Sequence, residues 1–171
     1  MSFPPLSCLD PSFWDYKNEG FDSIILSWNG IGHPELDKKV LRIFKNQYPG
    51  FFRTGMKQIT DFTEKVIILQ KYVNILSKYL PEIDGGSPVL VTEDFLQSIS
   101  HKIEDLRPHR RRKESFVCLT AKVAILHDDH TPSDSLVFEI KPKWGFMPSC
   151  PLIPKDSPKL KISRFQLLQY T

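Results

Sequence analysis

Alternating apolar and polar residues mark several short segments of the chain as β-strands. Ser23–Trp28 and Lys39–Phe44 are rich in β-branched and aromatic residues, and the connection between them has turn chemistry at Asn29, Gly30 and Pro34. These two segments are predicted to pair as an antiparallel hairpin. Further strands are predicted at 89–91, 116–126 and 136–140, with a polar, turn-like segment at 127–135 before the last of them.

Apolar residues three and four positions apart predict two helices. The first runs from Gln58 to the proline at 81, about six turns, and its apolar stripe is wide enough to predict a helix that faces the core; a coiled coil or a surface for a partner protein is the alternative. The second follows Thr92, a suitable N-cap, and is expected to end near Arg107 because Pro108 restricts the residue before it. Residues 2–12 read as an irregular arm.

The resulting order of β, β, α, β, α, β, β does not alternate regularly. It favours an α+β fold with a mainly antiparallel sheet over a doubly wound parallel fold. The chain has 171 residues, 40% of them apolar and 25% charged, which fits one ordinary globular domain or two small lobes. No apolar run approaches the roughly 20 residues needed to cross a bilayer, and the first twelve residues do not resemble a secretion signal.

The three cysteines and the charges narrow the class of protein further. Cys8, Cys118 and Cys150 are widely spaced, so neither a disulfide framework nor a zinc site is expected, and a reducing compartment is indicated. Residues 1–100 carry 10 basic and 12 acidic side chains, whereas residues 101–171 carry 13 basic and 8 acidic ones. The positive potential is therefore local, and it points to an anionic partner such as phosphate, nucleic acid or a lipid headgroup.

Two features near the start of the chain could bind phosphate. The segment Tyr16–Gly20 runs into the strand at Ser23, and a glycine in such a turn lets backbone N–H groups approach an anion. Arg42 lies in the strand that follows, on the same face as Val40 and Phe44. An ordinary hairpin turn and an arginine that faces solvent on an edge strand are the alternatives.

Two features in the basic half carry more charge. Arg107–Lys113 holds five permanent positive charges in seven residues and is expected to form a loop, which could bind nucleic acid or a compact polyphosphate, act as a nuclear localisation patch, or be merely solvated. In the extended segment 138–146, Glu139, Lys141 and Lys143 point to one side. They form a small site suited to phosphate, and an edge strand guarded by lysines is the alternative.

The segment 139–146 resembles the E-I-K-P-K-x-G-F signature of the inositol-pentakisphosphate 2-kinases. Other segments are similar to that family's motifs in the same order: 14–25 to its W-x-Y-x-G-E-G segment, with Asn18 in place of the first glycine, 40–44 to V-x-R-I, 107–111 to R-P-x-x-R, 129–130 to its D-H hinge segment, and 164–169 to R-F-x-x-H-Q, with leucine in place of histidine. Six ordered matches cover about 155 residues, so chance is an improbable explanation.

The resemblance implies a kinase-like fold. Residues 1–126 would form an N-terminal nucleotide-binding lobe, 127–135 a hinge-like segment, and 136–171 the start of a C-terminal inositol-phosphate-binding lobe. It implies ATP and Mg²⁺ as cofactors and inositol pentakisphosphate as the substrate, phosphorylated on its 2-hydroxyl to inositol hexakisphosphate. Lys141 would be catalytic, and Arg111, Lys141 and Lys143 would bind the substrate. The residues implied to bind the cofactor are Asn18, Glu19, Gly20, Arg42, Asp128, Asp129, His130 and Glu139.

In that family the acidic motif that binds the metal lies beyond the point where this sequence stops, so no metal ligand is assigned here and the 171-residue chain is expected to be inactive or nearly so. A monomer in the nucleus and cytoplasm is expected. Two readings from other functional classes stay open: a non-enzymatic module that binds RNA or inositol phosphates through Arg107–Lys113, and an adaptor that uses the first helix.

Overall fold

The computed structural model describes residues 3–50, 62–80 and 83–131, and the structural statements below concern these residues. The chain divides into a unit of residues 1–132 and a second unit of residues 133–171. The second unit lies outside the described residues. The predicted strand at 136–140, the start of the C-terminal lobe, and the side chains of Glu139, Lys141 and Lys143 therefore lie outside them as well.

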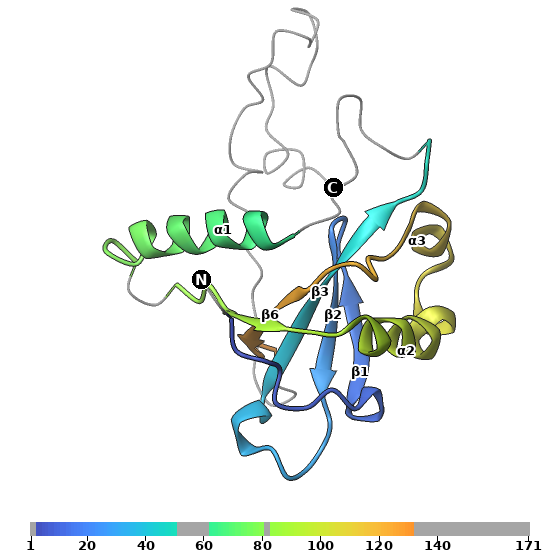
Figure 1. Cartoon of the computed structure of the whole chain (residues 1–171), viewed down its shortest axis with the longest axis horizontal. Helices are drawn as coiled ribbons and strands as arrows, with labels where there is room; N and C mark the ends of the chain where they lie inside the picture. The colour runs from blue at the N-terminus through green and yellow to red at the C-terminus, as the bar shows by residue number, and fades with distance from the viewer. Residues whose placement is uncertain (1–2, 51–61, 81–82, 132–171) are drawn as a thin grey trace, which may run out of the picture. The chain divides into compact units, whose positions relative to one another are not determined.

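The described strands form one antiparallel sheet of six strands (Figure 1). They are β1 (Trp14–Glu19), β2 (Ser23–Trp28), β3 (Lys39–Gln47), β4 (Ser87–Leu90), β5 (Ser115–Val117) and β6 (Val123–Asp128). Their order is β1-β2-β3-β6-β4, and β5 pairs with the end of β3. The α+β class, the mainly antiparallel sheet and the pairing of β2 with β3 are thereby confirmed, and the sheet fits a kinase-like N-terminal lobe.

Two strand predictions need correction. The segment before Gly20 is strand β1 rather than a turn. Trp14 is the one residue of this strand that is fully buried. The single run predicted at 116–126 is two strands, β5 and β6, because residues 118–122 leave the sheet between them. These residues carry Cys118 and Ala121 into the core instead.

Helix α2 (Glu93–Ile103) covers one face of the sheet and ends four residues before Arg107, where its end was predicted. Thr92 is its N-cap, and its hydroxyl accepts a hydrogen bond of 3.2 Å from the Phe95 amide. The buried residues of α2 pack into the same apolar core as those of β2 and β3, because both elements direct one face inward. The core contains Trp14, Ile24, Leu26, Leu41, Ile43, Phe95, Leu96, Ile99 and Ile103. A short 3₁₀ turn, η3 (Glu104–Leu106), follows the helix.

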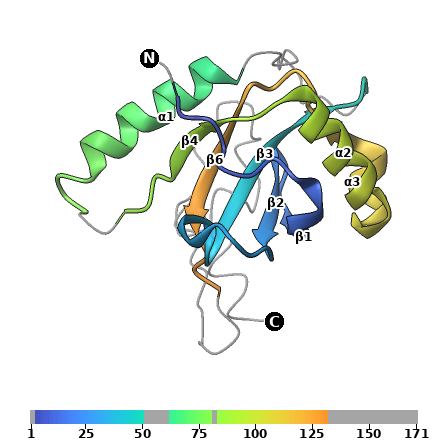
Figure 2. The same cartoon turned by 60° about the horizontal axis from the view of Figure 1, so that its bottom comes forward.

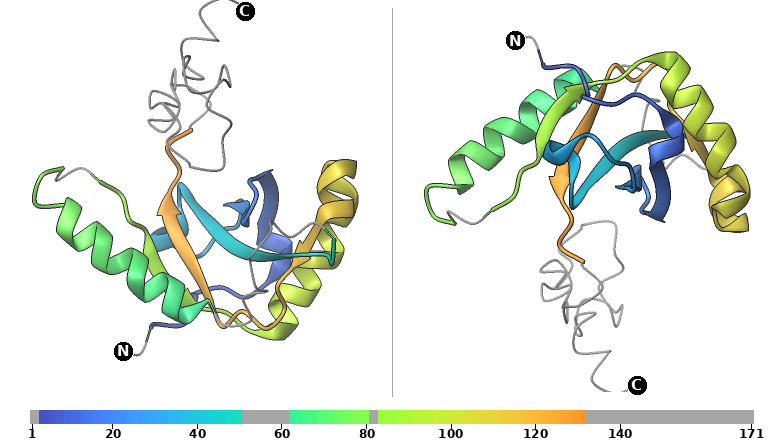
Figure 3. Two further views of the ribbon diagram at one scale, coloured as in Figure 1. Left: turned by 90° about the horizontal axis from the view of Figure 1, so that it is seen from above. Right: turned by 90° about the horizontal axis from the view of Figure 1, so that it is seen from below.

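Helix α1 (Thr63–Leu76) is the first predicted helix, and the prediction that it faces the core is wrong. Only Val66 of the helix is buried, whereas Ile68, Tyr72 and Ile75 are about half exposed. The helix also stops at Leu76 rather than at the proline at 81. Figures 2 and 3 show α1 on the β4 side of the sheet, with α2 and α3 on the other side.

The basic cluster Arg107–Lys113 was predicted to be a loop, and this prediction is wrong. His109–Glu114 forms the short helix α3. Pro108 is the N-cap of this helix, so the proline that restricts the preceding residue also begins the next element. Arg107 is buried, with only 3% of its surface exposed. The cluster is therefore split between one interior cation and a helix at the surface.

The N-terminal arm is irregular for most of its length, but it is docked on the sheet. Pro5 forms a parallel bridge with Leu90 of the edge strand β4. The Leu6 amide donates to the Leu90 carbonyl at 2.9 Å, and the Leu90 amide donates to the Pro4 carbonyl at 2.7 Å. The two remaining short turns are η1 (Pro11–Phe13) and η2 (Pro34–Leu36). Among the described residues, no helix has the length and apolar character needed to span a membrane.

Candidate functional site

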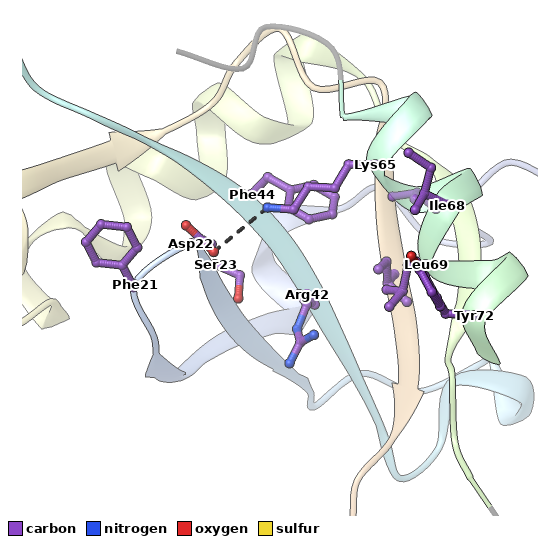
Figure 4. Close-up of a pocket in the computed structure, with 11 residues that line it drawn as sticks. Phe21, Asp22, Ser23, Arg42, Phe44, Lys65, Ile68, Leu69 and Tyr72 are labelled. Atoms are coloured by element: carbon purple, nitrogen blue, oxygen red, sulfur yellow. Dashed lines mark ion pairs between the residues drawn. The ribbon is translucent and has the colours of Figure 1, made fainter. Parts of the chain in front are cut away.

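Arg42 lies at the centre of the sheet face opposite α2. Its register partners are Ile25 on β2 and Ile125 on β6, so an apolar residue flanks it on either side. A pocket of about 510 Å³ opens over this face. Figure 4 shows its walls: the β1–β2 turn with Phe21 and Asp22, the β3 residues Arg42 and Phe44, and the α1 residues.

The guanidinium of Arg42 has spare hydrogen-bonding capacity. Within the described residues its Nε is buried and has no hydrogen-bond partner, and no carboxylate forms an ion pair with it. A buried donor without an acceptor is costly unless a ligand or water supplies one. At the rim of the pocket, Lys65 of α1 lies 3.8 Å from the Asp22 carboxylate, so these two charges balance each other and Arg42 supplies the positive charge. The pocket is therefore suited to an anion, and its apolar walls suit a flat, partly apolar group beside it.

The segment 127–131 is held by ion pairs to the early strands. His127 and Asp128, which were predicted to belong to a turn-like segment, are the last two residues of β6. Lys17 of β1 contacts the Asp129 carboxylate at 2.6 Å, and Lys39 of β3 pairs with Asp128. The Asp129 carboxylate also accepts bonds from the amide and hydroxyl of Thr131. Burial raises the pKa of Asp129, but the bonds from Lys17 and Thr131 outweigh burial and hold the pKa below its ordinary value. The segment is thus fixed beside the open face of the sheet.

Asp84 braces the same segment from the other side. Its carboxylate lies 3.4 Å from Nδ1 of His127 and 3.3 Å from Nε2 of His130, and it accepts a bond from the Gly86 amide at 2.8 Å. Burial and the nearby Arg42 charge lower the pKa of His127, and Asp84 opposes both. For Asp84 itself, burial raises the pKa, but the Gly86 amide and the two histidines lower it below its ordinary value.

The predicted nucleotide loop is divided between the two faces of the sheet. Asn18 is exposed, and its side chain accepts a bond of 2.7 Å from the Glu19 amide. Gly20 has open space where a Cβ would stand, and its amide donates to the Ser23 carbonyl at 2.9 Å. The Glu19 side chain is buried and pairs with Lys45. Lys45 is three residues from Arg42 on the same strand, so alternation places Lys45 on the face opposite Arg42, which is the α2 side. Glu19 therefore lies on the α2 side as well.

Arg111, the predicted ligand of the inositol phosphate, lies on α3. Its guanidinium is partly exposed and 3.6 Å from the Glu114 carboxylate. Arg110 also pairs with Glu114, at 2.6 Å, and Arg112 pairs with Asp105 at 3.2 Å. Acidic neighbours therefore balance much of this cluster, which weakens the reading of Arg107–Lys113 as one continuous surface for nucleic acid.

Arg42 lies in the pocket, and Gly20 precedes the turn residues that line its edge. Asp129 and His130 are held beside it by Lys17 and Asp84, whereas Asp128 pairs with Lys39, which alternation places on the face opposite Arg42. Glu19 and Arg111 lie on the side of α2 and α3. Sequence reasoning missed Lys45 and Asp84, both single charged residues without a local motif. Within residues 3–50, 62–80 and 83–131, no group of three or more His, Cys, Asp or Glu side chains is arranged to hold a metal ion.

The chain matches the family model of inositol-pentakisphosphate 2-kinase over residues 16–171. It is 28% identical to the inositol-pentakisphosphate 2-kinase of Oryza sativa subsp. japonica and to that of Arabidopsis thaliana, in each case over 94% of this chain and 42% of the relative. It is 27% identical to the inositol-pentakisphosphate 2-kinase of Cryptococcus neoformans, over 97% of this chain and 41% of the relative.

This protein therefore belongs to the inositol-pentakisphosphate 2-kinase family, as its motifs indicate. The chain spans about two fifths of the length of the curated relatives it matches.

Proposed function

We propose that this protein acts as an ATP-dependent inositol-pentakisphosphate 2-kinase, and that the described sheet is its nucleotide-binding lobe. The observation that carries the proposal is Arg42, a cation whose buried Nε lacks a partner in the described residues and which faces a pocket of about 510 Å³. Family membership supplies the reaction: transfer of the γ-phosphoryl group of ATP to the 2-hydroxyl of inositol pentakisphosphate, giving inositol hexakisphosphate.

ATP fits the residues present. Arg42 would bind a phosphate oxygen, because a guanidinium forms strong charge-assisted hydrogen bonds with phosphate. Asp128, Asp129 and His130 would hold the adenine and ribose end, and the pairs that Lys17 and Lys39 form with these aspartates keep the segment in place. Gly20, with no side chain above the pocket, would let the turn approach the phosphates. Bound ATP supplies the phosphoryl group.

The polyol phosphate would be bound from a second direction. Arg111 on α3 is our candidate for one of its phosphates, with Lys141 and Lys143 as further ligands and Lys141 as the catalytic cation. Glu139 is our candidate for a nucleotide contact in the same segment. The described residues contain no set of ligands suited to Mg²⁺, so no step is assigned to the metal. We expect a monomer in the nucleus and cytoplasm.

The test is nucleotide binding by the wild-type chain and by Arg42→Ala, measured by calorimetry with a non-hydrolysable ATP analogue. Loss of a charge-assisted contact should weaken binding about 10- to 100-fold. Lys71→Gln removes the same charge from an exposed position on α1 and should leave binding unchanged. Equal affinities for wild type and Arg42→Ala would refute this assignment of the pocket.

The reaction itself is tested on the protein expressed from its gene, with ATP and inositol pentakisphosphate, by following appearance of a phosphate on the 2-hydroxyl. Absence of that product would reject the kinase proposal. Binding of inositol phosphates or RNA that depends on salt but is indifferent to ATP and to Arg42→Ala would instead support the non-enzymatic module.

A further inference from the structure

Three charged side chains that no binding role explains lie together inside the fold. Glu19 of β1, Lys45 of β3 and Arg107 after α2 have side chains that are at most 1% exposed. Lys45 Nζ lies 2.5 Å from Oε2 of Glu19, and Arg107 donates to both oxygens of the same carboxylate at 3.3 Å. We call these three residues the Glu19 network.

One end of the Glu19 network holds the β1–β2 turn. Besides the Glu19 carboxylate, Lys45 Nζ donates to the backbone carbonyl of Gly20 at 2.8 Å. The Gly20 amide is bonded across the turn to the Ser23 carbonyl, and Ser23 lines the pocket that contains Arg42. Lys45, a buried cation on the α2 side of the sheet, therefore holds the backbone of the β1–β2 turn, and this turn borders the pocket on the opposite face.

The other end holds helix α3. Arg107 donates to the carbonyl of Arg111 at 3.3 Å and to the carbonyl and hydroxyl of Ser115 at 2.9 and 3.2 Å. Its remaining contact is Glu104, at 3.4 Å. Because the guanidinium is planar and rigid, these bonds fix the backbone of α3 relative to the Glu19 carboxylate. The carbonyl of Gly20 and the carbonyl of Arg111 are thus joined through three side chains.

Stability alone is a weak reason for this arrangement. Desolvation of buried charges offsets most of the attraction between them, and well-packed apolar residues would often serve as well or better. What a buried, fully bonded charge network supplies is a defined geometry. Here the two segments whose geometry is defined are those proposed to contact the nucleotide and the inositol phosphate.

We infer that Lys45, Glu19 and Arg107 are positioning residues that couple the nucleotide turn to the Arg111 helix, so that a ligand at one end changes affinity at the other. This inference rests on the proposed function for the identity of the two ligands. It reassigns Glu19 from a direct contact with the cofactor to a residue that acts through its neighbours. Burial holds the pKa of Lys45 below its ordinary value, and the Glu19 carboxylate opposes this effect only in part.

The coupling is tested first without ligands, by hydrogen exchange of single amides. Lys45→Met cuts the link to Gly20 and leaves Glu19 paired with Arg107, whereas Arg107→Lys keeps the charge and cuts the bonds to α3. Lys45→Met should speed exchange of the Arg111 amide, and Arg107→Lys should speed exchange of the Gly20 amide, each about tenfold. The Asn29 amide, bonded to the Phe13 carbonyl at the far end of the β1–β2 pair, should not change.

A merely structural role would confine each effect to the neighbours of the altered residue or would speed all amides together, and either result overturns the inference. The matched control is Lys102→Met, which removes another lysine that ties α2 to the start of β1 and the turn before it, through the Pro11, Ser12 and Trp14 carbonyls. It should leave the Gly20 and Arg111 amides as in wild type.

The second measurement uses a non-hydrolysable ATP analogue and inositol pentakisphosphate as probes, with the wild-type protein. Saturation with one probe should lower the Kd of the other about fivefold or more. Lys45→Met should bring this ratio of Kd values to within about twofold of unity, whereas Lys102→Met should preserve it. Binding of both probes with an unchanged factor in Lys45→Met overturns the inference. If neither probe binds wild type but the exchange effects cross the network, the proposed function fails and the coupling of the two segments stands.

Discussion

Gly86 packs against the centre of the candidate site, and replacing it with alanine should be one of the costliest small changes in the chain. Its φ is +66°, a left-handed conformation that costs an alanine roughly 1–2 kcal/mol. A Cβ there would also lie 2.5 Å from Cγ2 of Ile125 and 2.6 Å from Cε1 of His127. Overpacking of this kind adds about 1–3 kcal/mol, so the expected loss is about 2–5 kcal/mol.

Three further glycines separate the two contributions. Gly32 has a φ of +86° and open space around it, so alanine there should cost only the backbone strain. Gly30 has no positive φ, but a Cβ would lie 2.5–2.8 Å from the Trp28 and Phe13 rings, so alanine there should cost only the overpacking. Gly20 has neither feature, and Gly20→Ala should leave stability unchanged or raise it by at most about 1 kcal/mol.

The assay is urea denaturation of the four alanine variants, followed by circular dichroism. The reasoning fails if Gly86→Ala loses no more stability than Gly32→Ala, because the contacts with Ile125 and His127 would then be irrelevant. It also fails if Gly20→Ala is destabilised as much as either, since no contact or strain accounts for such a loss.

Other perturbations have equally definite outcomes. Glu19→Ala leaves two buried cations without their carboxylate and should lower the free energy of unfolding by about 3–5 kcal/mol in the same assay. Burial and the Arg42 charge lower the pKa of His127 below its ordinary 6.5, so the folded chain binds a proton at this histidine less readily than the unfolded chain. The contribution of His127 to stability is therefore full above pH 6.5 and should fall as the pH drops below that value. His127→Gln should flatten this part of the profile of unfolding free energy against pH. Thr92→Ala removes the N-cap of α2 and should cost about 1 kcal/mol of unfolding free energy; a loss below a few tenths would contradict the cap.

The sequence predicted those strands and helices that are marked by their own residue composition or by a capping residue. Strands β2 and β3 are dense in β-branched and aromatic residues, and Thr92 followed by acidic residues marks the start of α2. Strand β1 was not predicted because its apolar alternation is short: Trp14 and Tyr16 face the core, but polar residues fill the rest of the strand.

The error over α1 has a different cause. A periodic apolar stripe shows that a helix is amphipathic, but it does not show what the stripe faces. On α1 the same spacing places Ile68, Tyr72 and Ile75 at the surface of the described structure. For α3, Pro108 was taken only as the end of one helix, although proline is equally common where a helix begins.

For the candidate site, the sequence could indicate single residues but not their surroundings. Strand alternation placed Arg42 and Phe44 on one face, and both residues line the pocket; the role of Arg42 as a ligand of the nucleotide is a proposal. The partner that encloses Arg107 is Glu19, 88 residues away, so no run of charges near Arg107 could reveal that it is buried. Whether a cation is available to a ligand is decided by such distant carboxylates, and only the fold identifies them.

The backbone pairing of the N-terminal arm with Leu90 has a practical consequence for handling the protein. The exposed edge of a sheet readily recruits a strand from another molecule, and proteins commonly cover such edges. Removing residues 1–6 would strip the cover from β4 and free the amide and carbonyl of Leu90. Chains shortened in this way should aggregate at concentrations at which the full chain does not, although they would retain every residue assigned here to a ligand.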